Sequence, residues 1–283
     1  MAELIPLQTS DAAAGDDQYL FSVVIPLYNE QNILDRNVET LAGFFDAIVG
    51  RDRWYFLFVE NGSTDRTPDL ADATAARYAP SRVIHLPEPN YGIALKTGLR
   101  AATTKWVYVI DIEQWDFPFI VWSWQSRNAY DLLIASKRAD FTICHQHYYR
   151  RVLSCALNGL LQVLVQFSGT DTHGPKLLNR NSLQSIIAEC ELDRGQYDTE
   201  LVLRAVRAQK RIIEAPSEYR ELRPNRNWMI KKIVWNLWAL ARLVKIMKAV
   251  PHQGLARYYR VAREDVLAEV DRLQSAMPEA RRV

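Results

Sequence analysis

Short apolar runs that alternate with helix-patterned segments constrain this chain more than any other feature of its sequence. The runs are rich in β-branched and aromatic residues and end in polar clusters, as buried strands do; they cover residues 21–27, 54–60, 82–86 and 105–111. The segments between them carry apolar residues at helical spacing over 32–50, 67–79 and 92–103. This alternation predicts a mostly parallel, doubly wound α/β sheet, in which ligands bind at the carboxyl ends of the strands.

The second half of the sequence is less regular. We expect strands over 131–138 and 211–221 and helices over 149–167 and 198–210. The expected division is a flexible lead over 1–18, a catalytic domain over 19–226, an amphipathic helical segment over 227–260 and a polar helix or tail over 261–283.

Composition and motif content exclude several classes of protein. Among 283 residues, 48% are hydrophobic and the net charge is only +2, so the balance does not favour a nucleic-acid partner. Cys144, Cys155 and Cys190 form no CxxC pair, which favours a reducing cytoplasm over a disulfide framework or zinc site. No GxGxxG or Walker-type loop is present, so a dinucleotide dehydrogenase or P-loop enzyme is not expected. No run of about 18 apolar residues predicts a membrane-spanning helix.

The segment "DIEQWD" follows the fourth predicted strand and contains Asp111, Glu113 and Asp116. In an extended chain, residues two apart point to the same side, so Asp111 and Glu113 can face one divalent cation while Ile112 packs the other way. The alternative is that these carboxylates are only the solvated end of a strand.

Several motifs in sequence order resemble those of the inverting family 2 glycosyltransferases, which have the GT-A fold. They are "VVIPLYNE", "FVENGSTDRT", "EPNYGIALKTGLRAAT" and "VYVIDIE", and the resemblance continues to about residue 226. Within the family, Asp171 to Lys176 and Tyr197 to Glu200 are similar to segments of the dolichyl- or polyprenyl-phosphate sugar synthases.

The resemblance implies a nucleotide-sugar donor, UDP- or GDP-linked, and a divalent cation, Mg²⁺ or Mn²⁺, held by Asp111 and Glu113. It implies a pocket for the base and ribose made by Pro26, Tyr28, Asn29, Glu30, Glu60, Asn61, Ser63 and Asp65, with Lys96 reaching the diphosphate. Each of the pocket residues could instead shape a turn. The sequence departs from the family pattern at Asn61 and Glu113, because the family usually has an aspartate at each of these positions.

The acceptor decides which further groups are needed. A polyprenyl phosphate is already ionised and needs cations, for which Arg138 and Arg220 are the preferred candidates. A hydroxyl acceptor needs a base, and Asp198 is the candidate; its alternative role is a helix cap.

Residues 228–250 are the segment in which the sequence suggests a contact with the membrane that would hold a lipid acceptor. Met229, Ile233, Leu237, Leu240, Val244 and Met247 form an apolar stripe, and Trp235 and Trp238 lie among Lys and Arg residues, which is typical of a helix at a membrane surface. The alternative is a helix docked on the domain or at a dimer contact.

We therefore predict a metal-assisted glycosyltransferase, peripheral on the cytoplasmic face of the membrane, that moves a sugar to a polyprenyl phosphate or other lipid. A homo-oligomer is left open. The rival interpretations are a soluble family 2 enzyme that glycosylates a hydroxyl and a non-catalytic nucleotide-sugar binding protein.

Overall fold

The computed structural model of the protein describes residues 18–78, 80–140, 142–145, 148–220, 229–252, 254 and 257–276. Its strands are β1 (Phe21–Leu27), β2 (Trp54–Asn61), β3 (Arg82–Leu86), β4 (Trp106–Val109), β5 (Leu132–Ser136), β6 (Cys144–His145), β7 (Lys176–Asn179), β8 (Arg211–Pro216), β9 (Tyr219–Arg220) and β10 (Arg257–Arg260). Its α-helices are α1 (Leu34–Val49), α2 (Thr67–Arg77), α3 (Tyr91–Ala101), α4 (Phe117–Ser126), α5 (Tyr148–Val165), α6 (Arg180–Glu189), α7 (Tyr197–Arg207), α8 (Met229–Ala249) and α9 (Arg263–Ala276).

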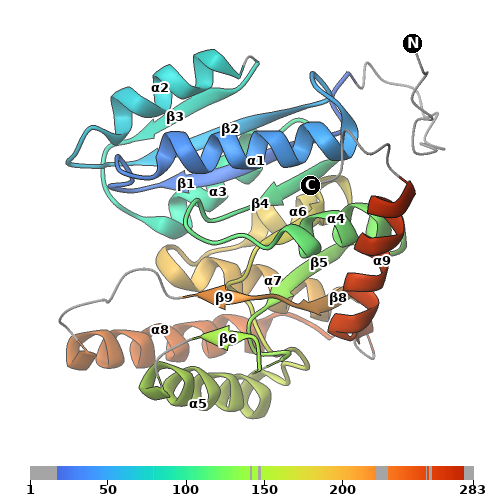
Figure 1. The fold of residues 1–283 in the computed structure, drawn as a ribbon. Coiled ribbons are helices and arrows are strands. Elements are labelled where there is room, and N and C mark those ends of the chain that lie inside the picture. Colours follow the sequence, from blue (N-terminus) through green and yellow to red (C-terminus); the bar gives the residue numbers. More distant parts are fainter. Residues whose placement is uncertain are drawn as a thin grey trace.

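Eight of the described strands form one sheet in the order β10-β8-β5-β7-β4-β1-β2-β3 (Figure 1). Strand β7 runs antiparallel to both β4 and β5, and the other neighbouring pairs are parallel. The carboxyl ends of the parallel strands therefore share one edge of the sheet with the beginning of β7. Strands β6 and β9 form a separate two-stranded sheet.

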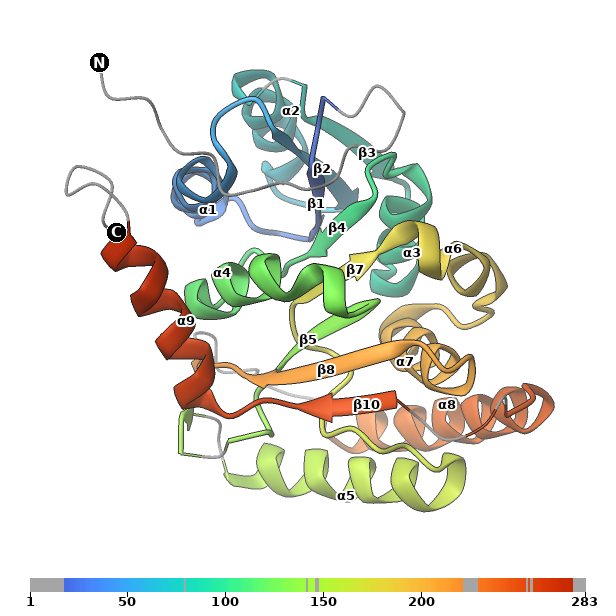
Figure 2. The ribbon, with the colours of Figure 1, turned by 90° about the vertical axis from the view of Figure 1, so that its right-hand side faces the viewer.

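Alternate residues of the central strands enter two different hydrophobic cores. On β1, Phe21, Val23 and Ile25 belong to one core and Val24 belongs to the other. Helices α1, α4 and α9 cover the first face of the sheet, whereas α3, α6, α7 and α8 cover the second (Figure 2). Burial on both faces explains why the central strands are continuous apolar runs.

The predicted α/β sheet is confirmed, and its first four strands and first three helices lie where the pattern placed them. The strand expected over 105–111 is shorter, because β4 ends at Val109 and a turn follows. The pattern missed helices α4 and α6 and strands β6 and β7.

The carboxyl-terminal part is also organised differently from the expectation. Residues 257–260 were expected in a helical segment but form β10, which pairs with β8. Helix α9 packs against α4, with Val266 buried in the core that α1 and α4 share. The predicted domain boundaries themselves stay a prediction, and most of the expected lead over 1–18 lies outside the described residues.

Helix α8 docks on the domain through the half whose side chains are described. Leu240, Leu243 and Met247 are buried in the core on the α7 side of the sheet. Trp238 is 60% exposed and shares the outer face of α8 with Arg242. The side chains of Met229, Ile233, Leu237 and Trp235 lie outside the described part.

No helix within the described ranges is both long enough and apolar enough to cross a bilayer.

Candidate functional site

The turns that follow β1 and β2 are braced against each other at the carboxyl edge of the sheet. The backbone N–H of Asn29 donates to Ser63 Oγ at 3.1 Å, and Thr64 N–H donates to Asn29 Oδ1 at 2.8 Å. One residue further along, Glu30 N–H donates to Thr67 Oγ1 at 2.7 Å. Asn29 has a φ of 56°, a left-handed conformation that Asn tolerates better than most residues. These bonds hold the two turns in a fixed relation before any ligand arrives.

Asp65 extends this bracing and is kept ionised by it. Its carboxylate accepts from Gln31 N–H at 3.3 Å and from Thr67 N–H at 2.9 Å. Burial opposes ionisation, but the bonds from Thr67 and Gln31 outweigh it and lower the pKa of Asp65.

Glu60 and Asn61, at the end of β2, are both buried and hydrogen-bonded within the protein. Glu60 Oε1 accepts from Ser63 N–H at 2.6 Å, and Glu60 Oε2 lies 3.4 Å from His85 Nδ1. Asn61 Oδ1 accepts from Asn90 N–H at 2.7 Å, which ties β2 to the start of α3. Where an aspartate is usual in the family pattern, the amide of Asn61 thus has a structural partner.

The remaining residues of the predicted donor pocket differ in their environments. Tyr28 is 43% exposed just beyond β1, so its ring is accessible to a ligand. Pro26 is half-buried within β1. Lys96 donates from Nζ to the backbone carbonyl of Cys190. The predicted role of Lys96 at a diphosphate stays a prediction.

Asp111 and Glu113 lie in a turn, not in the extended strand that the sequence predicted. Gln114 N–H donates to the backbone carbonyl of Asp111 at 3.0 Å, and Glu113 N–H donates to Asp111 Oδ1 at 3.1 Å. Ile112 is fully buried, and its backbone carbonyl accepts a hydrogen bond from Asn37 Nδ2 at 2.8 Å. The expectation that Ile112 faces the core is confirmed, but a turn rather than strand alternation sets the relation of the two carboxylates.

A divalent cation fits the carboxylates of this turn. Asp111 is exposed and Glu113 is partly exposed, so carboxylate oxygens can be reached from solvent. Mg²⁺ is commonly bound by one or two carboxylates, with substrate phosphates and waters as the other ligands. Within the described ranges, no group of three or more His, Cys, Asp or Glu side chains could hold an ion by itself. The two carboxylates of this turn are a donor set that such an ion accepts.

Asp116, the third carboxylate of "DIEQWD", has a structural role. Its Oδ1 caps α4 by accepting from Phe119 N–H at 3.2 Å. Its Oδ2 accepts from Glu218 N–H at 2.7 Å and pairs with Arg263 Nη1 at 2.9 Å. This almost fully buried carboxylate connects α4 to α9 and to the segment after β8.

A buried ion pair lies at the beginning of β7 on the same edge. Lys176 Nζ is 3.0 Å from Asp198 Oδ1, and both side chains are at most 2% exposed. Lys176 Nζ also donates to the carbonyl of Gly174 at 2.8 Å. Asp198 Oδ2 is buried and has no hydrogen-bond partner in the described part of the chain. The cap role considered for Asp198 is wrong, because Gln196 precedes α7 and no side chain caps it.

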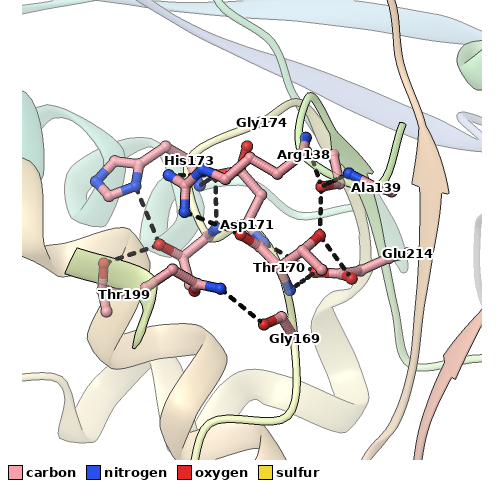
Figure 3. A network of polar contacts seen from close by, with 12 residues as sticks. Arg138, Ala139, Gly169, Thr170, Asp171, His173, Gly174, Thr199 and Glu214 are labelled. Carbon is pink, nitrogen blue, oxygen red and sulfur yellow. Dashed lines mark hydrogen bonds and ion pairs between the residues drawn. The ribbon is translucent and has the colours of Figure 1, made fainter. Parts of the chain in front are cut away.

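Arg138, Asp171 and Glu214 form a second polar network beside this pair (Figure 3). Arg138 donates from Nη1 to Thr170 O at 2.9 Å, and its Nη2 is 3.6 Å from Asp171 Oδ1. Glu214 accepts from the N–H groups of Thr170 and Asp171 at 2.7 and 3.0 Å. Burial opposes ionisation of Asp171, but Arg138 and then Lys137 outweigh it and lower its pKa.

Two buried atoms of this network have no hydrogen-bond partner among the described residues. They are Nε of Arg138, a donor, and Oδ2 of Asp171, an acceptor. Gly174 sits where the chain passes close to β5, since a Cβ there would lie 1.7 Å from Ala135 O. The Asp171–Lys176 segment, noticed in the sequence only as a family resemblance, thus supplies two charged groups to the site.

His173 is fixed by hydrogen bonds beside these groups. Its Nε2 lies 2.8 Å from Gly195 O, and its Nδ1 lies 3.0 Å from Thr172 Oγ1. The carbonyl partner requires a proton on Nε2, so Nδ1 of the neutral ring accepts from Thr172.

The phenol of Tyr91, at the start of α3, is influenced by carboxylates from both parts of this edge. Removal from water raises the pKa of Tyr91 well above its usual range, and the carboxylates of Asp198 and Asp111 act in the same direction. The Asp111 turn and the Lys176–Asp198 pair are therefore close enough to act on one phenol. No pattern in the sequence singled out Tyr91 beyond its place in the "EPNYG" motif.

Arg220 cannot be placed in the same way. It lies in β9, which pairs with β6, but its side chain falls outside the described part of the chain, and its predicted role stays a prediction.

Comparisons with known proteins agree with this architecture. Residues 22–112 match the model of "Glycosyl transferase family 2". The glycosyltransferase AglD of Haloferax volcanii is 26% identical over 220 residues, which cover 76% of this chain but only 35% of AglD. The dolichyl-phosphate beta-glucosyltransferase ALG5D of Trichomonas vaginalis is 24% identical over 72% of this chain and 67% of ALG5D. The chain thus spans about a third of AglD and two thirds of ALG5D.

The fold is shared with a solved glycosyltransferase. The mannosyltransferase PcManGT of Pyrobaculum calidifontis, solved with GDP-Man and Mn²⁺, has a TM-score of 0.55 and 18% identity; the match covers 94% of this chain and 77% of PcManGT. At this identity the likeness shows the fold alone.

Proposed function

We infer that the chain is a family 2 glycosyltransferase with the GT-A fold, as its sequence predicted, and we propose that it moves a sugar from a UDP- or GDP-sugar to a polyprenyl phosphate. The observation that carries the proposal is that the carboxylates of Asp111 and Asp198 both act on the phenol of Tyr91 and raise its pKa. A donor bound at the first carboxylate and an acceptor bound near the second would meet beside this phenol.

Hydrogen bonds within the protein order the backbone of the proposed donor half. The hydrogen bonds between the turns at Asn29 and Ser63 fix the backbone that would surround the base and ribose. A site that is already ordered loses less entropy when its ligand binds. Tyr28, exposed at the rim, is the aromatic surface available to a base.

Asp111 and Glu113 would hold the divalent cation, Mg²⁺ or Mn²⁺. When bound, the ion would neutralise charge that develops on the leaving diphosphate. The complex of PcManGT with GDP-Man and Mn²⁺ supports the proposal of a divalent cation. Glu113, longer than an aspartate, would place its oxygens less rigidly than Asp111.

Arg138 is the group we assign to the acceptor phosphate. Its guanidinium is fixed by Thr170 and Asp171, and its Nε retains an unused donor. An ionised phosphate oxygen can attack the anomeric carbon and invert it as the bond to the departing nucleoside diphosphate breaks, so no base has to remove a proton. The name of ALG5D, a dolichyl-phosphate glucosyltransferase, supports a lipid phosphate as the acceptor. Arg220 is the second cation that we propose for this role.

A hydroxyl acceptor is the second candidate, and one observation favours it. Asp198 Oδ2 is buried and has no hydrogen-bond partner in the described part of the chain. A carboxylate oxygen of this kind is suited to accept a proton from a substrate hydroxyl. Lys176 would then orient Asp198 through its other oxygen.

We further propose that the protein binds the cytoplasmic face of the membrane through the outer face of α8, where Trp238 is exposed with Arg242 and Lys245. Vesicle binding that is weakened by Trp238→Ala supports this assignment, and binding unchanged by that substitution contradicts it.

Calorimetric titration with UDP and GDP, with and without Mg²⁺ or Mn²⁺, tests the donor site. Wild-type protein should bind one nucleotide in a metal-dependent manner, and Asp111→Ala should lose that dependence. Glu39→Gln, which removes an exposed carboxylate on α1, is the matched control and should bind as the wild type does. Binding that ignores both the metal and the Asp111 substitution would favour a non-catalytic binding protein.

Transfer assays then separate the two acceptors. With a polyprenyl phosphate, Arg138→Met should lower kcat/KM by roughly a hundredfold, since a charged hydrogen bond is lost. Asp198→Asn should have the larger effect if the acceptor is a hydroxyl.

A further inference from the structure

Helix α5 presents a stripe of apolar side chains to the outside of the protein. Val152, Leu160, Val163 and Leu164 are 48%, 42%, 80% and 45% exposed, and they account for four of the nine most exposed large apolar residues in the described part of the chain. Their spacing places them on one side of a helix. We call these four residues the α5 stripe.

The α5 stripe is not needed to attach the helix to the domain. Leu161 and Val165, on the opposite side of α5, are 4% and 3% exposed and lie in the core that α7 shares. Helix α5 is therefore apolar on its inner side for packing and apolar again on its outer side. A contiguous apolar surface of this kind on a folded protein commonly marks an interaction site.

The charges around the stripe indicate the kind of partner. Neither α5 nor α8 contains an Asp or Glu, and the two helices contact each other at the same end of the molecule (Figures 1 and 2). Exposed Arg242, Lys245 and Lys248 lie on α8 beside the exposed Trp238. An apolar surface flanked by cations and an indole matches the interface of an anionic bilayer.

A second copy of the chain fits this surface less well. A twofold contact through α5 would bring the same surface of two molecules together. Because α8 lies beside α5, the cations of both copies would be gathered at that contact with no carboxylate on either helix to offset them.

We propose that the α5 stripe enters the boundary between headgroups and acyl chains of an anionic bilayer, with α8 lying beside it at the headgroup level. The membrane contact is then a surface of two helices. It extends the contact proposed for α8 alone and requires no sugar transfer, so vesicle binding can fail or succeed independently of the proposed chemistry.

Co-sedimentation of the full chain with phosphatidylcholine vesicles, with and without phosphatidylglycerol, measures the contact. The variant Val163→Gln/Leu164→Gln should bind phosphatidylglycerol vesicles at least roughly tenfold more weakly, since two exposed apolar groups are lost without a change in charge. Leu267→Gln on α9 is the matched control; Leu267 is 40% exposed, and its substitution should leave binding unchanged.

An unsubstituted cysteine gives a second measurement that does not depend on the variant folding. Cys155 is exposed on α5, whereas Cys144 and Cys190 are buried, so a polarity-sensitive fluorophore can be attached to Cys155. Its emission should shift to shorter wavelength when phosphatidylglycerol vesicles are added.

Several results would overturn the proposal. One is equal vesicle binding by wild type and the α5 variant, including the case in which Trp238→Ala alone removes binding. Others are an absence of vesicle binding, or a fluorophore shift that occurs without vesicles and follows dimer formation in analytical ultracentrifugation.

Discussion

Replacing Lys176 by Met should destabilise the protein by an amount that the buried ion pair determines. At 3.0 Å from Asp198 Oδ1, an effective dielectric constant near 20 gives an attraction of about 5 kcal/mol. Removing one member of a buried pair leaves the other charge uncompensated, which typically costs about 3–5 kcal/mol. Among the described residues, Asp198 Oδ2 has no hydrogen-bond partner that could offset the loss of the ammonium group. Since domains are stable by only about 5–15 kcal/mol, the loss should be plain in denaturant unfolding.

A double-mutant cycle isolates the pair from the loss of packing. Lys176→Met and Asp198→Asn should each destabilise the protein, and the double variant should be less destabilised than the two single effects combined, by at least about 1 kcal/mol. If Lys176→Met costs under about 1 kcal/mol and the two effects simply add, the pair is not the buried, uncompensated interaction inferred from the structure.

Three further substitutions test other parts of the structure by unfolding measurements. Gly174→Ala should cost on the order of several kcal/mol because its Cβ would collide with a carbonyl of β5, whereas Gly43→Ala, in open space on α1, should gain about 0.5–1 kcal/mol; equal effects would contradict this explanation. Burial lowers the pKa of His85, but Asp72 and Glu60 outweigh it and raise that pKa above 6.5. The corresponding stability is complete below pH 6.5 and is lost as pH rises through the raised value, so His85→Gln should flatten the pH dependence of unfolding in that window.

The sequence was sufficient to predict the strands of the first half because burial on both faces leaves a continuous apolar run. The same reasoning could not find α4, since Phe119, Ile120, Val121, Trp122 and Trp124 are all buried and no polar face remains to show a helical period. Strand β10, with the sequence RYYR at the edge of the sheet, carries almost no apolar signal.

The candidate site was predictable where local motifs supply it and not where distant segments meet. The turn at Glu60 to Asp65 has a local signature, and the structure adds that many of its polar groups brace backbone. The Lys176–Asp198 pair depends on the packing of β7 against α7, which no spacing in the sequence reveals. For α5, the sequence predicted an apolar helix but could not show that one apolar side faces outward, because exposure depends on neighbouring elements.

The pairing of β10 with β8 has a consequence for how the protein is made. Residues 257–276 leave the ribosome after every other described strand and helix has been synthesised, so β8 has an open edge until they emerge. Unpaired N–H and C=O groups on such an edge can join the strands of other nascent chains. Protein that lacks this segment should therefore accumulate as insoluble material instead of as a smaller enzyme, and chaperones that shield strand edges should matter most before β10 has emerged and paired with β8.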